Sequence, residues 1–478
     1  MKRKLLIITL GIFGFTNILK SQNFSDKSIV LKTINYNLNV KVDFQEDKMY
    51  STCELSVLNP TDEKVQIIPL LLYRLLKVTS IKDEYGNSIS YKQQVLAYED
   101  WEVMQVNFVE IELEKPIVKD EIKKLFIKYS GHLLGYSETG MNYVKDKIDP
   151  IFTIIRPDCQ AYPEIGYPSS IVNRKSGLQN FDYTIVATVP DSLMVVNGGK
   201  LINKTSKNGF TTYIYKNIKK AWRIDIAIGK YSALQYDKTK LFFFPQDSIG
   251  AKTVLKYVEK TFDLYSSWWG PLKDFQGFSV IEIPDGYGSQ ADVSSILQTA
   301  SVFVDSTQMR QLYHEISHLW NVESNDEFSP RWNEGLATFL EYLVIEKLEN
   351  REYLDYVTKW YLNTVKMELL KDTVFASTPL IDFGKKSITQ YSYSMGMIMF
   401  RVLYGIVGET NFNEIVGSFY QKYYKTGAST EDFVQHSKTI SNFNLNIFFQ
   451  DWVYTTNYTR FVKDNMTIDE MVGLYSKN

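Results

Sequence analysis

The first half of the chain alternates hydrophobic and polar side chains. Between about residues 23 and 236 the alternation runs through stretches such as INYNLNVKVDF, VNFVEIELEKP, KKLFIKYSG and FDYTIVATVP. A period of two residues is typical of strands that are buried on one face. Turn-forming stretches such as NPTD, EYGN, NGGK and SKNG separate them. The pattern therefore predicts one large antiparallel β domain over residues 23–236.

From about residue 240 onwards the hydrophobic spacing becomes helical. Two strand-like stretches, KLFFFPQD and FQGFSVIEIP, flank a helical stretch, AKTVLKYVEKTFDLYSSWWG. After Asp305 the helical spacing continues through a series of segments from DSTQMRQLYHEISHLW to TEDFVQHSKTI. We expect a mostly α-helical second domain with a small sheet over residues 240–458, followed by a C-terminal tail over residues 459–478. The predicted fold class is α+β with two domains.

The N-terminus has the layout of a secretory signal peptide. A basic start at residues 2–4 precedes an apolar run over residues 5–15, and Ser21 is a small residue at a suitable cleavage position. A helix that spans a bilayer needs about 20 apolar residues, so this run is too short. We expect residues 1–21 to be a signal peptide and the mature protein to be periplasmic or extracellular, without stable membrane insertion. A short anchor that stays uncleaved is the alternative.

Charge and cysteine content narrow the function classes. The 478 residues carry 53 Lys and Arg against 55 Asp and Glu, a net charge of -2. No basic excess exists to neutralise phosphates, so nucleic-acid binding is not expected. Two cysteines, Cys53 and Cys159, are too few for a disulfide scaffold or a cysteine-built zinc site. They form either a single disulfide or two buried thiols.

Two of the four histidines lie in one short segment, HEISH. On a helix, His314 and His318 stand one turn apart on the same face and can point two imidazoles at one metal ion. Glu315 lies beside them, where a zinc-bound water needs a general base. The segment is predicted to be helical, with Asp305 as its N-terminal cap. The alternative is a helix with two solvent-facing histidines.

Zinc in a catalytic site needs a third protein ligand. Glu334 lies near the start of the next predicted helix, RWNEGLATFLEYL, and a pair of helices would bring it beside the two histidines. Glu323, Glu327 and Glu341 are the rival candidates. Glu323 and Glu327 fall in the connecting loop, which holds a ligand less rigidly. We assign Glu341, seven residues after Glu334, to a second role, as a carboxylate that orients one histidine.

The two helices together resemble a known zinc core. HEISHLW followed by NEGLATFLEYL is similar to the core of the aminopeptidase N (membrane alanyl aminopeptidase) family of gluzincin peptidases. WWGPLKDF, YSYSMGMIMFRVL and FFQDWVYTTNYTRF resemble further segments of that family, and FDYTIVATVP with VVNGGKL resembles its N-terminal domain. The resemblance implies a saddle-like β domain followed by a thermolysin-like catalytic domain.

The resemblance also implies a role for each matching residue. The implied ligands of a single zinc ion are His314, His318 and Glu334. Glu315 would be the general base that takes a proton from the zinc-bound water and later passes it to the leaving amine. Tyr393, in a Tyr-x-x-Gly setting, would donate a hydrogen bond to the developing oxyanion. Tyr391 is the competitor for that role, and a core aromatic is the alternative reading of Tyr393.

The spacing of the implied ligands departs from the family pattern. Only 15 residues lie between His318 and Glu334, fewer than the family usually has. The missing residues fall in the loop NVESNDEF, so both helices can keep their places while the cleft changes shape. The chain also stops soon after WVYTTNYTRF, without the helical C-terminal domain of larger members, and an open cleft could admit longer peptides.

The segment that anchors a substrate's free amine departs further. Family aminopeptidases carry Gly-x-Met-Glu-Asn, whereas this chain has DGYGSQADV. Neither glycine in it places a glutamate correctly, and Asp285 or Asp292 is a possible replacement. A glutamine that the family's β domain supplies is not clearly in register at Gln160. The segment could still pair with substrate backbone, and its candidate substrate-binding residues are Gly286, Gly288, Ser289 and Gln290.

These features lead to three hypotheses. The first is an exported, aminopeptidase-like zinc peptidase that acts on peptides or unfolded proteins. The second is an endopeptidase on the same zinc site, since the amine-anchoring glutamate is missing. The third is a secreted peptide-binding module without turnover. The sequence leaves side-chain preference and oligomeric state open.

Overall fold

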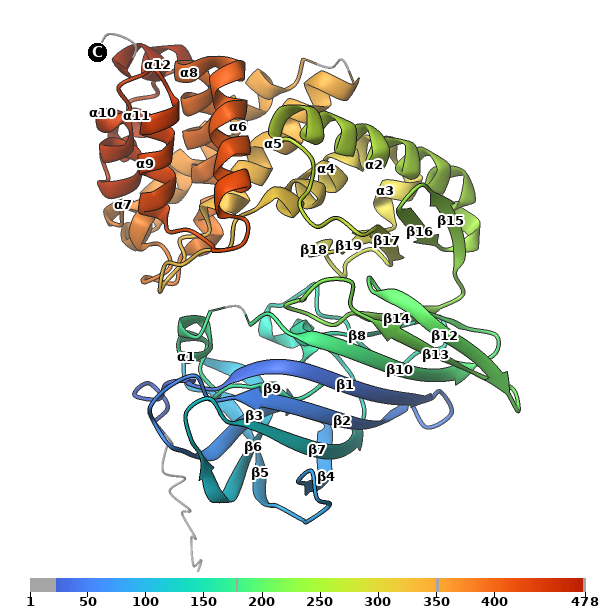
Figure 1. The fold of residues 1–478 in the computed structure, drawn as a ribbon. Coiled ribbons are helices and arrows are strands. Elements are labelled where there is room, and N and C mark those ends of the chain that lie inside the picture. Colours follow the sequence, from blue (N-terminus) through green and yellow to red (C-terminus); the bar gives the residue numbers. More distant parts are fainter. Residues whose placement is uncertain (1–22, 178, 350–351, 476–478) are drawn as a thin grey trace, which may run out of the picture.

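A computed structural model describes residues 23–177, 179–349 and 352–475. The expected signal peptide, residues 1–21, lies outside the described residues. A β-rich N-terminal domain and a mostly helical C-terminal domain stack on one another (Figure 1), which confirms the fold class expected from the sequence. Of the helices described, none has both the length and the apolar composition that a membrane crossing requires.

The largest sheet of the N-terminal domain has seven strands. They are β1 (Lys32–Asp43), β2 (Lys48–Leu58), β4 (Leu76–Lys82), β7 (Ile122–Gly131), β10 (Asp182–Pro190), β12 (Lys200–Lys207) and β13 (Phe210–Lys216). Their order is β12-β13-β10-β1-β2-β7-β4. β1 runs parallel to β10, with Leu38 opposite Ile185, and antiparallel to β2, with Leu38 opposite Cys53. Alternate residues of β1, among them Val40, are buried, as the period of two predicts.

Two smaller sheets and a short helix complete this domain. The four-stranded sheet, in the order β5-β6-β3-β9, is made of β5 (Ser90–Tyr98), β6 (Trp101–Ile117), β3 (Val65–Tyr73) and β9 (Glu164–Ile165). The three-stranded sheet, in the order β11-β14-β8, is made of β11 (Met194–Val196), β14 (Ile226–Gly229) and β8 (Phe152–Ile155). The helix is α1 (Ser170–Lys175).

A five-stranded sheet opens the C-terminal domain. Its strands are β15 (Ser232–Tyr236), β16 (Thr239–Phe243), β17 (Phe278–Ile283), β18 (Gln290–Asp292) and β19 (Ser295–Thr299), in the order β15-β16-β17-β19-β18. β16, β17 and β19 are parallel, and β18 is an antiparallel edge strand. Ile281 and Leu297 of this sheet pack in one buried cluster with Phe152 and Val196 of the three-stranded sheet. This shared core joins the two domains.

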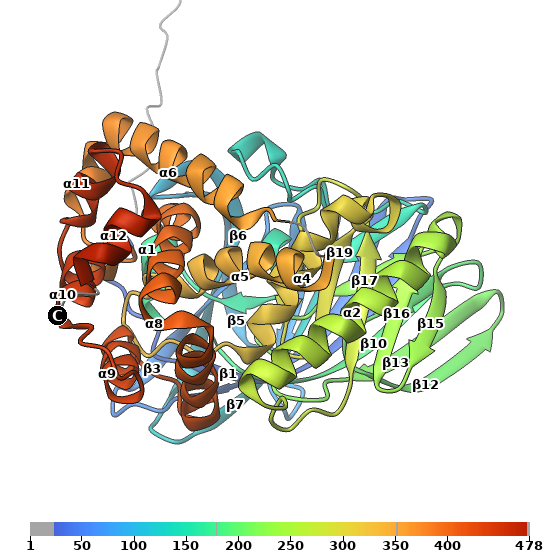
Figure 2. The ribbon, with the colours of Figure 1, turned by 90° about the horizontal axis from the view of Figure 1, so that it is seen from above.

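Helices form the rest of the C-terminal domain. They are α2 (Ser248–Trp269), α3 (Ser301–Val304), α4 (Arg310–Ser317), α5 (Trp332–Glu349), α6 (Leu354–Lys371), α7 (Thr373–Ser377), α8 (Ser392–Tyr423), α9 (Thr430–Ile440), α10 (Asn446–Phe449), α11 (Tyr458–Lys463) and α12 (Ile468–Tyr475). α5 is buried on nearly all sides, and Figure 2 shows it in the middle of the helices, with α4, α6 and α8 around it. α8 is two helical pieces that join at Gly408, whose φ is 75°.

The structure shifts two boundaries that the sequence suggested. The N-terminal domain was expected to extend to residue 236 and so to include β15. In the structure β15 pairs with β16 in the five-stranded sheet of the C-terminal domain. Residues 459–478 were expected to be a tail. They include most of α11 and all of α12, and Met471 and Tyr475 are buried in the core of the C-terminal domain. The amphipathic spacing of these last residues makes them part of the domain.

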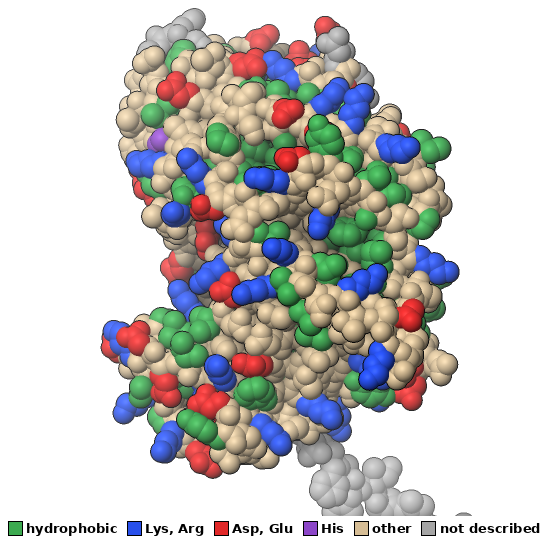
Figure 3. Space-filling view, turned by 45° about the vertical axis from the view of Figure 1, so that its right-hand side comes forward, with side chains coloured by type: hydrophobic (Ala, Val, Ile, Leu, Met, Phe, Trp, Pro, Cys, Tyr) green, Lys and Arg blue, Asp and Glu red, His purple; other side chains and the backbone are tan. Residues whose placement is uncertain are grey.

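Charged side chains are dispersed over the surface. On the face that Figure 3 presents, basic and acidic side chains alternate over both domains, in line with a net charge of -2.

Candidate metal centre and active site

The HEISH segment lies on α4 and the turn that follows it. The Asp305 side chain accepts the backbone N–H of Thr307 and caps the entry to the segment. Leu312 and Ile316 are fully buried and fix one face of α4 against the core. His314 and His318 therefore share the opposite face, with ring centroids 4.9 Å apart.

Glu334 reaches the two histidines from the first turn of α5. Its Oε2 lies 3.5 Å from His314 Nε2 and 3.4 Å from His318 Nε2. Two ligand atoms held about 2.0–2.1 Å from zinc at a tetrahedral angle are themselves about 3.3 Å apart. The three ligand atoms lie within 4.8 Å of one another, so two imidazoles and a carboxylate fit a zinc ion with a fourth position open.

Charge around the histidines also favours a cation. Burial lowers the pKa of His314, but hydrogen bonds with Glu334 and Glu341 and the charge of Glu315 raise it to about 10 overall. The pKa of Glu334 is well below its usual range, because the two histidines outweigh the effect of its burial. The same concentration of carboxylates attracts a divalent ion.

Each expected zinc ligand also contacts a polar side chain on the side that faces away from the metal centre. Glu341 Oε2 lies 3.1 Å from His314 Nδ1, and its Oε1 accepts a hydrogen bond from Arg310 Nη1 at 2.9 Å. The structure thus places Glu341 where the sequence expected an orienting carboxylate. The sequence analysis missed Asn321, whose side-chain amide lies 2.7 Å from His318 Nδ1.

Arg331 was missed as well. Its Nη2 donates to Glu334 Oε1, which leaves Oε2 turned toward the histidines. The two residues are three positions apart, a spacing at which ion pairs form at a helix start. This spacing is the sequence signal that could have revealed Arg331. Asn321 and Arg310 had similar signals, three residues after His318 and four before His314.

Glu315 and Tyr393 flank the cluster. Burial raises the pKa of the Glu315 carboxyl above its ordinary value. The Tyr393 ring stacks 6.2 Å from the His314 ring and is 37% exposed. Tyr391, the competitor, points elsewhere, since its hydroxyl donates to Asp372 Oδ2 at 2.8 Å and its ring stacks on Phe375. Tyr393 is therefore the tyrosine that faces the metal centre.

Two glycines bring Glu334 and Tyr393 together. Gly335 follows Glu334 on α5, and Gly396 lies one turn after Tyr393 on α8. A Cβ added to Gly396 would lie 2.8 Å from Gly335 Cα. Because neither residue has a side chain, the two helices can touch backbone to backbone at the site.

Comparison with known proteins agrees with this geometry. Residues 295–452 match the Peptidase family M1 domain. This match, the aminopeptidase relatives and the solved M1 zinc metallopeptidases support the aminopeptidase N-like gluzincin family. The cofactor that this family implies is zinc. The matched residues include both histidines, Glu334 and Tyr393.

Relatives of the M1 domain include several aminopeptidases. Aminopeptidase M1-B of Oryza sativa subsp. japonica is 22% identical over 52% of this chain and 31% of its own length. Glutamyl aminopeptidase of Rattus norvegicus is 20% identical over 90% of this chain and 47% of its own length. The chain thus spans less than half the length of these relatives.

Solved M1 structures share the fold. An M1 zinc metallopeptidase from Deinococcus radiodurans matches with a TM-score of 0.63 at 16% identity, covering 88% of this chain and 94% of that one. A mutant of it bound to a Tyr-Ser-Ala substrate matches with a TM-score of 0.63 at 17% identity, with the same coverage of both chains. At this identity the match establishes the fold, including the two-domain arrangement.

The rival carboxylates in the shortened M1 loop lie away from the metal centre. Glu323 Oε2 accepts a hydrogen bond from Asn180 of the N-terminal domain at 3.0 Å, and Glu327 is exposed. The loop is tied instead to the first residue of α9, because Asp326 accepts hydrogen bonds from Thr430. The shorter connection therefore leaves α4 and α5 side by side.

The candidate substrate-binding segment lies along α4 at the edge strand β18. Ser289 Oγ accepts hydrogen bonds from Gln298 Nε2 at 2.9 Å and from the Thr299 backbone at 3.2 Å. Gly286 and Gly288 both have positive φ, 85° and 71°. These contacts hold the segment in place and engage the Ser289 side chain inside the protein.

Gln290 belongs to a buried polar network between the domains. Its Oε1 accepts a hydrogen bond from Arg223 Nη2 at 2.6 Å, and its Nε2 donates to Asp158 Oδ1 at 2.6 Å. Arg156, fully buried, donates to the carbonyl of Tyr287 at 3.1 Å. The side chain of Gln290 is thus used inside the protein, and no pattern in the sequence indicates this role.

The proposed replacements for the amine anchor are engaged or buried. Asp285 accepts the backbone N–H of Ser301 at 2.8 Å, and Asp292 is buried, with a pKa that burial raises to about 7. Gln160 lies inside the N-terminal domain, where it hydrogen-bonds Tyr98 and Tyr136. The structure brings none of these three described residues to the metal centre.

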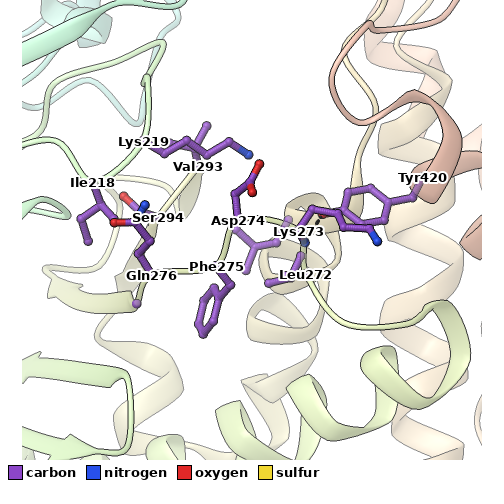
Figure 4. A pocket seen from close by; sticks show the side chains of 12 residues that line it. Ile218, Lys219, Leu272, Lys273, Asp274, Phe275, Gln276, Val293, Ser294 and Tyr420 are labelled. Carbon is purple, nitrogen blue, oxygen red and sulfur yellow. Dashed lines mark hydrogen bonds between the residues drawn. The ribbon is translucent and has the colours of Figure 1, made fainter.

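The two cysteines and a small cavity add nothing to the site. Cys53 and Cys159 are buried free thiols, so the disulfide alternative does not hold. The cavity, of about 30 Å³, lies between Lys219 of the N-terminal domain and the loop that contains Asp274 and Phe275 (Figure 4). A space of that size suits a water molecule and excludes a peptide.

Proposed function

We propose that this chain is an exported, aminopeptidase-like zinc peptidase that hydrolyses peptides or unfolded proteins. The observation that carries the proposal is the convergence of His314, His318 and Glu334 at separations that fit tetrahedral zinc. The M1 domain supports the reaction class. The basic and apolar layout of residues 1–21 supports export.

The residues around the ligands divide the proton transfers between them. Zinc, when bound, polarises the scissile carbonyl and lowers the pKa of a coordinated water to about 7. Glu315 accepts a proton from the attacking water and delivers it to the leaving amine. Tyr393 donates a hydrogen bond to the developing oxyanion. Burial and Glu334 raise the pKa of Tyr393, so its hydroxyl keeps the proton it must donate.

Backbone pairing at β18 supports the binding of an extended peptide. β18 is the edge of its sheet and lies against α4, so an extended substrate can add to it as a further strand. This arrangement would present the scissile carbonyl to the metal centre.

Endopeptidase action is the second candidate, and the segment around β18 favours it. Asp285 is engaged by Ser301, and Asp292 is buried. Burial therefore keeps Asp292 from the α-ammonium group of a substrate, and the hydrogen bond from Ser301 holds one oxygen of Asp285 on the backbone. N-acetylation of a cleaved peptide separates the two candidates, because an aminopeptidase loses that substrate and an endopeptidase keeps it.

A peptide-library digest read by mass spectrometry tests the proposed activity. We expect cleavage that a zinc chelator abolishes and that added zinc restores. Glu315→Gln should lower kcat by about 10²–10⁴-fold while zinc binding persists. Cleavage that survives both the chelator and Glu315→Gln would refute the proposal. Binding of peptides without cleavage would favour the non-catalytic module.

A further inference from the structure

Arg331 connects a buried metal ligand to the open side of the site. Its backbone has a φ of 55°, a left-handed value for a non-glycine residue, and its carbonyl accepts the N–H of Glu334 at 3.0 Å. This conformation turns the side chain back, so that Nη2 donates to Glu334 Oε1. The Glu334 side chain is 7% exposed, whereas the Arg331 side chain is 50% exposed. The guanidinium therefore has one end in the site and the other toward solvent.

Most of the donors of Arg331 are free. A guanidinium offers five N–H donors in a planar fork, and one nitrogen pairs with Glu334 among the residues that the structure describes. The partly exposed phenols of Tyr393, on α8, and Tyr143, on the N-terminal domain, interact electrostatically with it. The charge of Arg331 acts on the pKa of both phenols, opposing the rise that burial causes. Arg331 thus lies between the two domains, beside the residues that would process a substrate.

The carboxylates on the facing wall of the N-terminal domain are held by buried arginines. Arg156 pairs with Asp146 at 2.8 Å, and Arg223 pairs with Asp158 and Asp225, each at 2.7 Å. Two arginines and three aspartates leave this network with one net negative charge, but each of the three carboxylates is already engaged by a guanidinium inside the protein.

A further cation borders the same segment. Lys145 is exposed, and its side chain covers Gly286, where a Cβ would collide with Nζ. The carboxylates at the metal centre are themselves opposed by Arg310 and by Arg331, and a bound zinc ion would add two positive charges. A substrate group that approaches Arg331 therefore meets a positive environment.

We propose that Arg331 forms a carboxylate-recognising subsite and that the peptidase prefers substrates with a carboxylate next to the scissile bond. The carboxylate belongs either to an acidic side chain or to the C-terminus of a short peptide. The planar fork of arginine binds a carboxylate through two parallel hydrogen bonds, which a lysine cannot reproduce. This inference rests on the proposed peptidase function, since the subsite belongs to the same cleft.

Peptide binding to zinc-loaded Glu315→Gln protein tests the inference without turnover. One arm compares Ala-Glu-Ala-amide with Ala-Gln-Ala-amide, and the other compares Ala-Ala-Ala with its C-terminal amide, all with a free N-terminus and by calorimetry. We expect the carboxylate-bearing peptide of at least one pair to bind about tenfold more tightly than its twin. The arm that shows the preference identifies the source of the carboxylate.

Variants of Arg331 in the same background assign the preference. Arg331→Gln should remove the preference for the carboxylate-bearing peptide. Arg331→Lys should reduce this preference at least about threefold, because the planar fork is lost. Arg460→Gln, on α11, is the control and should leave the preference unchanged. Zinc content, measured for every variant, separates this role from positioning of Glu334. If Arg331→Gln loses zinc, the preference measured for zinc-loaded Arg331→Lys decides whether Arg331 recognises the carboxylate.

Two results would overturn the inference. One is equal affinity for the carboxylate-bearing peptide and its twin in both arms. The other is a preference that persists unchanged in the zinc-loaded Arg331 variants. Either result leaves the peptidase proposal intact, because that proposal is tested by zinc-dependent cleavage, whereas this one is tested by binding.

Discussion

At the scale of single residues, Glu341 controls how His314 is presented to a metal. Its carboxylate lies 3.1 Å from His314 Nδ1 and is held on its other oxygen by Arg310. A carboxylate on the outer nitrogen fixes the tautomer that leaves Nε2 free to bind. Glu341→Gln should therefore weaken zinc binding by about 10–100-fold, as measured by titration against a competing chelator. Glu409→Gln, whose carboxylate pairs with Lys347 on the surface, should bind zinc normally; an equal loss in both variants would contradict this role.

Glu282 gives a second residue-scale prediction, on pH and stability. It is fully buried on β17, and burial raises its pKa to about 9, against about 4.3 in an unfolded chain. Its contribution to stability is complete below about pH 4.3 and is lost as the pH rises toward 9. Across that window the free energy of unfolding falls by up to about 1.4 kcal/mol per pH unit.

The variant Glu282→Gln removes this titration while keeping the shape of the side chain. Its unfolding free energy should fall less steeply between pH 5 and pH 9 than that of the parent, as measured by urea denaturation at a series of pH values. Parallel pH profiles for the two proteins would show that Glu282 does not carry the effect.

At the scale of elements, the contact of α5 with α8 decides where Glu334 and Tyr393 stand. A Cβ on Gly396 would lie 2.8 Å from Gly335 Cα, so Gly396→Ala must push the helices apart. We expect a loss of about 1–3 kcal/mol in stability and a lower kcat/KM, from thermal unfolding and peptide hydrolysis. Gly473→Ala, on α12, meets nothing within 4 Å and should be neutral or stabilising. Equal stability of the two variants would argue against a tight contact.

The same elements show which features of the site could be predicted from the spacing of residues in the sequence. The spacing of His314 and His318 on a helix could be predicted, because helical geometry is local. The choice between Tyr391 and Tyr393 could not be made from spacing. It depends on a hydrogen bond from Tyr391 to Asp372, 19 positions away. Arg331 was missed because its left-handed backbone, in a loop without periodicity, turns its side chain back on Glu334.

At the scale of the whole molecule, the boundary between the domains was the least predictable feature. The buried Arg156 reaches the carbonyl of Tyr287, 131 positions later, and Arg223 reaches Gln290, 67 positions later. Such pairs join segments that are far apart in the sequence, and the hydrophobic pattern of each segment does not indicate its distant partner. The fold class could be read from the patterns, whereas the network that locks β18 to the N-terminal domain required the structure.

This network makes a prediction that distinguishes structure from substrate contact at Gln290. Its side chain bridges Arg223 and Asp158 across the domain boundary, so Gln290→Ala removes the hydrogen bond to Oδ1 of the largely buried Asp158. We expect the free energy of unfolding to fall by about 1–3 kcal/mol, and kcat/KM to fall with it because β18 is no longer fixed beside α4. Urea unfolding and peptide hydrolysis measure the two effects. Gln435→Ala, which removes an exposed bond to Glu431, should change neither. Unchanged stability with lost activity would instead make Gln290 a direct contact of the substrate.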